Sequence, residues 1–138
     1  MIRQRHKKRR TFVLLLALAL TLLAGCAAKE SGAVDRYCMQ NDIPPRTKYR
    51  IRLTLEELAQ QLLPRPVWTP FHVTVEYAPL EGEATVTVSY GGERFDPAEG
   101  GNELSCTVLR KSVEELRYSF DPAREMANSV CVRIREKP

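Results

Sequence analysis

The chain is poor in the residues that most catalytic and metal sites require. Its 138 residues include two histidines and four cysteines, with no Cys-x-x-Cys pair and no Ser-x-x-Lys, Gly-x-Ser-x-Gly or Walker motif. His72 occupies a polar position in an alternating apolar segment, with no nucleophile motif beside it. The sequence therefore predicts neither a zinc site nor a serine or cysteine nucleophile, and we interpret His72 as a surface side chain.

Basic charge is scarce outside the N-terminus. The first ten residues hold six of the 21 Lys and Arg, so the chain from Cys26 onward has 15 basic and 17 acidic residues, a net charge of −2. The basic character of the whole chain therefore belongs to its first residues. A nucleic-acid partner, which would require a basic surface, is not predicted.

The N-terminus has the order of a bacterial export signal, with a basic run, a short apolar run and a small-residue end. Phe12 to Ala24 is apolar or small apart from Thr21. As a helix this run would measure roughly 20 Å, less than the ~30 Å hydrocarbon core of a bilayer, so a permanent membrane span is the weaker interpretation. The run ends in Leu-Ala-Gly-Cys at Cys26 and resembles the lipobox of bacterial lipoproteins.

This resemblance implies that a signal peptidase cleaves before Cys26, and that Cys26 then carries acyl chains such as palmitate. The protein would be held at the extracytoplasmic face of the cell membrane. Two alternatives stay open: a plain signal peptide, and a leader that is no export signal on a cytoplasmic domain. The predicted organisation is a signal peptide with lipobox (1–25), a lipidated cysteine with a short tether (26–33) and a small α+β domain (34–138).

Apolar periodicity predicts most elements of this domain. They are a helix in 34–40, a hairpin of strands near 71–77 and 86–90, a helix over 104–113, and two closing strands at 116–120 and 130–134. The order predicts an α+β fold, a two-layer sandwich of a mostly antiparallel sheet with helices on one face. Trp68, in a proline-rich loop, is interpreted as packing over the core. One pair among the three later cysteines could oxidise outside the cytoplasm, and their spacing does not say which; they are Cys38, Cys106 and Cys131.

Residues 48–63 give conflicting signals. Lys48 to Leu55 alternate strictly between polar and apolar residues, which predicts a strand, whereas helical spacing begins at Leu55 and Thr54-x-x-Glu57 matches a capping box. A strand followed by a helix, and one continuous helix, both stay open. As a strand, the four cations between Arg46 and Arg52 would form one stripe that could lie on anionic lipid headgroups; in a helix they would spread around the cylinder.

Two motifs and their order resemble the histidine-kinase-type (GHKL) ATPases, and more closely the anti-sigma-factor serine kinases. Leu55 to Gln61 (LEELAQQ) resembles their first motif, a helix with Glu-x-x-x-Asn. Tyr90 to Pro97 (YGGERFDP) stands where they have Asp-x-Gly-x-Pro-Phe-Asp-Pro, and VLRK, LRYSF and the closing strand resemble their last helix and hairpin. The resemblance spans about residues 33–135 and implies a reduced Bergerat-type fold in which residues 46–63 form one long helix.

The resemblance also implies a nucleotide site, from which this sequence departs. Glu57 matches the general base, Gln61 stands where an Asn would hold Mg²⁺, and Gly92 lies in the nucleotide-binding turn. Tyr90 replaces the Asp that accepts a hydrogen bond from the adenine, and a phenol there would fill the pocket. Glu103 lies where the phosphate loop would have its glycines, and its charge would repel a triphosphate. We therefore expect the fold without ATP binding and without a cofactor.

The sequence thus predicts a lipid-anchored interaction module attached to the membrane, with a protein partner that it does not identify. One alternative is a cytoplasmic anti-sigma-type serine/threonine kinase that uses ATP and Mg²⁺, with Glu57 as its base. Another is a structural envelope lipoprotein of unrelated α+β fold, which a strand over residues 48–55 would favour.

Overall fold

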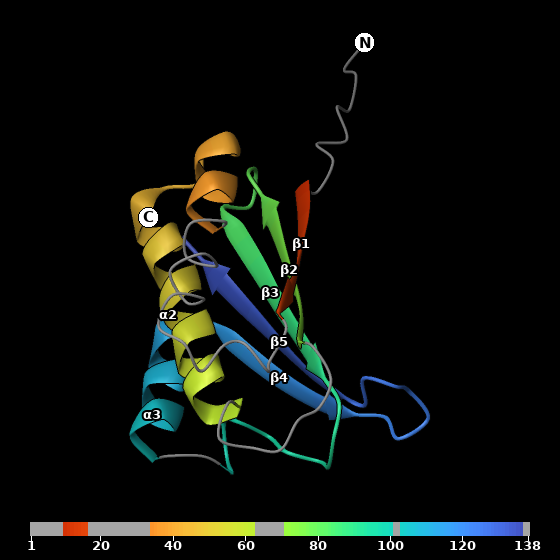
Figure 1. Cartoon of the computed structure of the whole chain (residues 1–138). Helices are drawn as coiled ribbons and strands as arrows, with labels where there is room; N and C mark the ends of the chain where they lie inside the picture. The colour runs from red at the N-terminus through yellow and green to blue at the C-terminus, as the bar shows by residue number, and fades with distance from the viewer. Residues whose placement is uncertain (1–9, 17–33, 63–70, 101–102, 137–138) are drawn as a thin grey trace.

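The structure, a computed structural model, describes residues 10–16, 34–62, 71–100 and 103–136. Within these ranges the chain forms a five-stranded antiparallel sheet of order β1-β2-β3-β5-β4, and the helices lie on one face of it (Figure 1). The predicted two-layer α+β architecture is confirmed. No helix in the described ranges is long and apolar enough to cross a membrane. The proline-rich loop with Trp68 lies outside these ranges.

The centre of the sheet is built from the two predicted hairpins. The strands are β2 (Phe71–Ala78), β3 (Glu83–Tyr90), β4 (Glu115–Phe120) and β5 (Asn128–Arg135). In β2, β3 and β5 every second residue is buried, because alternate side chains of a strand point to opposite faces and one face carries the helices. His72 lies at a half-buried position of β2, opposite Ser89, in the alternate row that faces away from the helices.

The first strand comes from the predicted leader. β1 (Arg10–Leu16) pairs antiparallel with the outer edge of β2, from Arg10 opposite Tyr77 to Leu16 opposite Phe71. This segment contains the start of the apolar run that the sequence assigns to a signal peptide. Cleavage before Cys26 would therefore remove a strand of the sheet and leave β2 at its edge.

The conflict over residues 48–55 is resolved in favour of one helix. α2 runs from Pro45 to Leu62, so the strand prediction from local alternation is wrong and the long helix implied by the resemblance is present. Proline is favourable in the first turn of a helix, where its missing N–H has no partner to lose. Thr54 lies inside α2 and is fully buried, so it does not cap a helix start.

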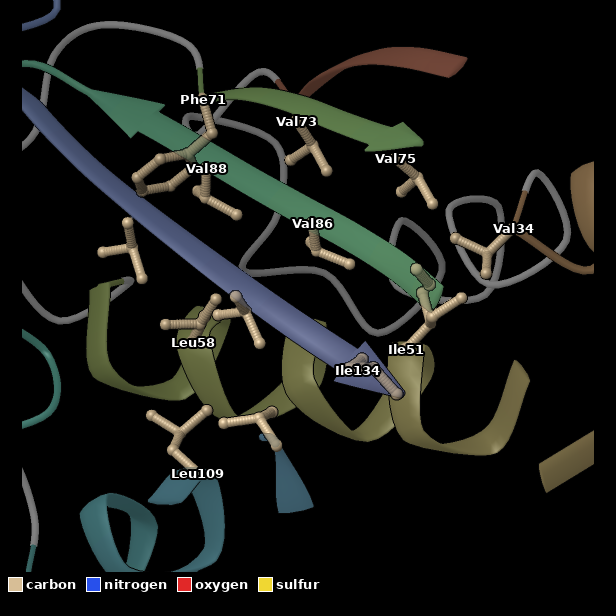
Figure 2. Packing of buried hydrophobic residues seen from close by; sticks show 14 of the residues in the cluster. Val34, Ile51, Leu58, Phe71, Val73, Val75, Val86, Val88, Leu109 and Ile134 are labelled. Atoms are coloured by element: carbon tan, nitrogen blue, oxygen red, sulfur yellow. The ribbon is translucent and has the colours of Figure 1, made fainter. Parts of the chain in front are cut away.

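The core explains why the helix prevails over the alternation. Ile51 and Leu58, two turns apart on α2, are completely or almost completely buried, and Figure 2 shows them facing the sheet near Val86 and Ile134. A strand would have sent these two side chains to opposite faces. Leu109 of α3 (Glu103–Ser112) adds to the same cluster, and α3 packs against α2.

The helical segment 34–40 follows its prediction and covers one end of the core. Its Tyr37 and Cys38 are buried, and it ends where Asp42 adopts a left-handed backbone conformation with φ of 53°. Burial raises the pKa of the Cys38 thiol to about 11, so this thiol is protonated and unreactive at neutral pH. Cys38, Cys106 and Cys131 are all free cysteines in the structure.

The four cations between Arg46 and Arg52 do not form a stripe, because they lie on a helix. Lys48 and Arg52 both approach Asp35, with N–O distances of 3.5 and 3.7 Å. The stripe depended on a strand, so the alternative in which the cations spread around a helix holds. These two cations instead tie α2 to the preceding helical segment.

Arg50 connects α2 to three later parts of the chain. Its guanidinium donates to the carbonyl oxygens of Ser112 and Arg135, at 2.8 and 2.7 Å, and to the Glu114 carboxylate at 3.1 Å. Hydrogen bonds from a charged donor contribute more than neutral ones. Arg50 thus fixes the end of α3 and the end of β5 against the same side of α2.

We predict that Arg50→Ala lowers the free energy of unfolding of the full chain by about 2 kcal/mol, because three acceptors lose a charged donor. Urea unfolding measures this change. The matched control is Arg46→Ala, one turn earlier on α2 and exposed, with an expected change within about 0.5 kcal/mol. Equal losses in the two variants would contradict a bridging role for Arg50.

Candidate functional site

The segments that carry the nucleotide-site resemblance meet at one end of the domain. Residues 91–100 connect β3 towards α3 and lie at the end where α2 finishes and α3 begins (Figure 1). This end is the candidate site. Its chemistry depends on how the glycine-rich segment is held and on which side chains fill the space behind it.

Tyr90 fills that space. The side chain is 1% exposed, and its ring packs edge-on against Phe71 with 5.8 Å between ring centroids. Its hydroxyl donates a short hydrogen bond to the carbonyl oxygen of Phe95, across the turn that it supports. The residue that stands where the family's adenine-binding Asp would be is therefore part of the core and has its polar atom satisfied internally.

Asn128 holds both ends of the turn. It is fully buried as the first residue of β5. Its amide nitrogen lies 3.2 Å from the carbonyl oxygen of Glu93 and 3.4 Å from those of Gly91 and Gly92. Its side-chain oxygen accepts the N–H of Phe95 at 3.1 Å. One amide therefore bonds backbone donors and acceptors on both sides of the turn.

Tyr118 of β4 completes this polar cluster. Its hydroxyl donates to the Asn128 oxygen at 2.5 Å and lies 3.1 Å from the backbone nitrogen of Phe95. Burial raises the pKa of Tyr118, partly offset by the hydrogen bond from the Phe95 backbone, so the phenol remains a donor at neutral pH. Three side chains from β3, β4 and β5 thus converge on one short turn.

The second half of the segment is fixed onto α3. The backbone of Asp96 accepts the N–H of Gly100 at 2.8 Å, and the Asp96 carboxylate accepts the N–H of Ala98 at 2.9 Å. Arg110 of α3 donates to the carbonyl of Ala98 at 3.1 Å. A side chain at Gly100 would come within 2.8 Å of the Phe95 ring, so the glycine allows this close packing.

The three residues that the resemblance assigns to nucleotide chemistry have unequal environments. Glu57 is half-buried and Gln61, one turn later on α2, is 6% exposed. Gly92 is exposed and has a φ of 91°, which favours glycine at this turn. The fold therefore brings the segments of the predicted site to one end, while the polar contacts found there hold the turn in place.

Two cavities beside this end have an acidic lining. One of about 220 Å³ includes Asp96, Glu99 and Glu114 in its wall, and one of about 350 Å³ includes Glu99 and Glu103. Arg110 is the basic residue that lines both. Neither Glu57, Gln61 nor Gly92 lines these cavities. The carboxylates in the cavity walls would repel a triphosphate.

The start of α3 has the same electrostatic character. Its first turn carries Glu103, which already places a carboxylate where the helix dipole would attract an anion. Across the described ranges, no group of three or more His, Cys, Asp or Glu side chains could hold a metal ion. The polar contacts at this end hold a rigid turn in place.

The role of Tyr118 has no signal in the sequence, whereas that of Asn128 has one. The apolar row Val130, Val132 and Ile134 continues back to Asn128 at the same spacing, so an amide occupies a core position. A buried polar residue in such a row requires partners nearby.

The chain was also compared with known proteins. No protein-family model matches it, and no curated protein gives a match. The resemblance to the GHKL ATPases therefore rests on the motifs and their order, and the functional interpretation rests on the geometry of the candidate site.

We predict that Asn128→Ala lowers the free energy of unfolding by roughly 3 kcal/mol, because it removes the hydrogen bonds between this amide and the backbone of the turn. Amide hydrogen exchange in residues 91–95 should accelerate more than in β2. Ser129→Ala, at the next position and on the other face of β5, is the control and should change little. If the exchange of the turn were the same in both variants, the turn would not depend on Asn128.

Proposed function

We propose that this protein is a lipid-anchored extracytoplasmic interaction module whose GHKL-like domain does not bind nucleotide. The observation that carries the proposal is the closed state of the candidate site. Tyr90 fills the space behind the turn, and Asn128 and Tyr118 satisfy the turn's backbone. A ligand entering there would have to break these contacts before making its own.

The electrostatics support the same proposal. Carboxylates line both cavities at this end, and Glu103 occupies the start of α3. Of the nucleotide contacts expected from the resemblance, Glu57 and Gly92 are retained, whereas the positions of Tyr90, Gln61 and Glu103 carry other residues. What the domain offers instead is a rigid body held on the membrane surface, with an anchor at Cys26 and a protein as its partner.

The absence of nucleotide binding can be measured directly. The full chain with a fluorescent ATP analogue and Mg²⁺ should give no saturable signal that excess ATP displaces. Gln61→Ala serves as the matched variant, because Gln61 stands at the metal-binding position. Micromolar binding that ATP competes away, and that Gln61→Ala weakens, would refute the proposal.

The lipid anchor has an independent test. Metabolic labelling with palmitate in a bacterium that processes lipoproteins should label the wild-type chain and leave Cys26→Ala unlabelled. Cys106→Ser should retain the label, since the modification is expected at Cys26 alone. Label that persists in Cys26→Ala, or no label in the wild type, would contradict the anchor.

One observation favours a second candidate. β1 completes the sheet with seven paired residues from the predicted leader, as expected if the leader is retained on a cytoplasmic domain. Under that reading the protein would be an anti-sigma-type serine/threonine kinase with ATP, Mg²⁺ and Glu57 as base. No palmitate label together with ATP binding would favour it. A structural lipoprotein of unrelated fold loses its specific support, because residues 48–55 are helical.

A further inference from the structure

We infer that, once the leader has been removed, the edge of β2 pairs with β2 of a second copy of this chain. The inference rests on the processing that the proposed function requires. It concerns an interface that is covered by β1 in the unprocessed chain.

The edge of β2 is able to accept a strand. β1 pairs with it continuously over Phe71 to Tyr77, with all seven residues in antiparallel register. On its other side β2 pairs with β3 without interruption, from His72 opposite Ser89 to Ala78 opposite Glu83. The pairing register of β2 is therefore continuous on both sides, and the strand contains no bulge.

This edge lacks the usual features that prevent association. β2 reads FHVTVEYA, with no proline and no lysine, and four of its eight residues are buried. Natural sheets protect edges with such residues, with bulges or with a covering segment. Here the covering segment is β1, and all of it precedes Cys26. Cleavage at the lipobox would expose backbone N–H and C=O groups along β2 that require new partners.

A second copy fits because β2 is complementary to itself. Antiparallel pairing centred on Thr74 places Phe71 opposite Tyr77 and Val73 opposite Val75, so buried-row residues meet buried-row residues. It pairs the same seven residues that β1 covers. The two-fold axis is then perpendicular to the sheet, and both helix layers lie on the same side of one continuous sheet.

Charge favours the same register. With Thr74 opposite Thr74, His72 of each copy lies opposite Glu76 of the other, on the face away from the helices. Opposite-charge or hydrogen-bonding cross-strand pairs are favourable, and symmetry supplies two of them. Anchoring of both copies to one membrane raises their effective concentration, so a modest interface suffices.

Disulfide cross-linking tests both the interface and its register. Thr74→Cys is expressed with its native leader, and the processed, membrane-bound protein is oxidised in isolated membranes. Cα atoms of directly opposed antiparallel residues lie about 4.5 to 5.5 Å apart, within disulfide range. We expect a covalent dimer of this chain at Thr74→Cys.

The matched control is Glu76→Cys, on the same strand and the same face. In the proposed register the two copies of position 76 are offset by four residues, roughly 14 Å, and cannot form a disulfide. We expect at least about a tenfold lower dimer yield than with Thr74→Cys. Wild-type protein, with its native cysteines, sets the background. A mixture of His72→Cys and Glu76→Cys chains should cross-link to each other.

Each outcome decides the inference. Dimer from Thr74→Cys but not from Glu76→Cys supports it. Equal yields, no dimer, or a disulfide to a different protein would overturn pairing with a second copy. Palmitate label and leader removal are checked in the same samples, so a processed, labelled protein without dimer refutes this inference and leaves the lipid anchor standing.

Discussion

The candidate site depends on one buried amide. Asn128 satisfies the backbone on both sides of the glycine-rich turn, and it can do so because it opens β5 next to the end of β3. Inside a protein an unpaired backbone group is costly, so the turn keeps this conformation for as long as the amide is present. The hydroxyl of Tyr90 donates to the Phe95 carbonyl oxygen, and that of Tyr118 donates to the Asn128 side-chain oxygen. A nucleotide could enter here only if these contacts broke, and the same contacts hold the turn against the sheet.

The contacts that close the site therefore also stabilise the sheet. Tyr90 packs on Phe71, the first residue of β2, and its hydroxyl reaches Phe95. Beyond Phe95, Arg110 links the backbone to α3 by donating a hydrogen bond to the carbonyl oxygen of Ala98. The contacts that fill this end of the domain are thus the same contacts that hold the turn to the sheet and to α3.

Much of the fold could be predicted from local pattern. The alternation of β2 and β3 and the apolar row of β5 reflect burial on one face, which a short window of sequence reports directly. Residues 48–55 could not be assigned this way, because their alternation and their helical spacing both place Ile51 on an apolar side. The helix is favoured because Leu58 and Ile51 pack together into one core with residues of β3 and β5, which lie far away in the sequence.

The motif order implied that the glycine-rich segment and the end of α2 lie at one end of the domain, and the structure places both segments there. The motif order could not reveal that Asn128, Tyr118 and Arg50 are the connecting residues, since their partners lie far away in the sequence and are brought near only by folding. The role of Arg10 to Leu16 was also hidden, because an apolar run suits an export signal and an edge strand equally well.

Arg50 has a consequence for the order of events during synthesis. Its partners Ser112, Glu114 and Arg135 lie 62, 64 and 85 residues further along the chain. Glu136 makes a similar late contact, accepting from Tyr77 at 2.7 Å and donating its backbone N–H to Gly82 at 2.8 Å. The helix α2 and the hairpin of β2 and β3 therefore gain these contacts only after residues 112 to 136 have been synthesised.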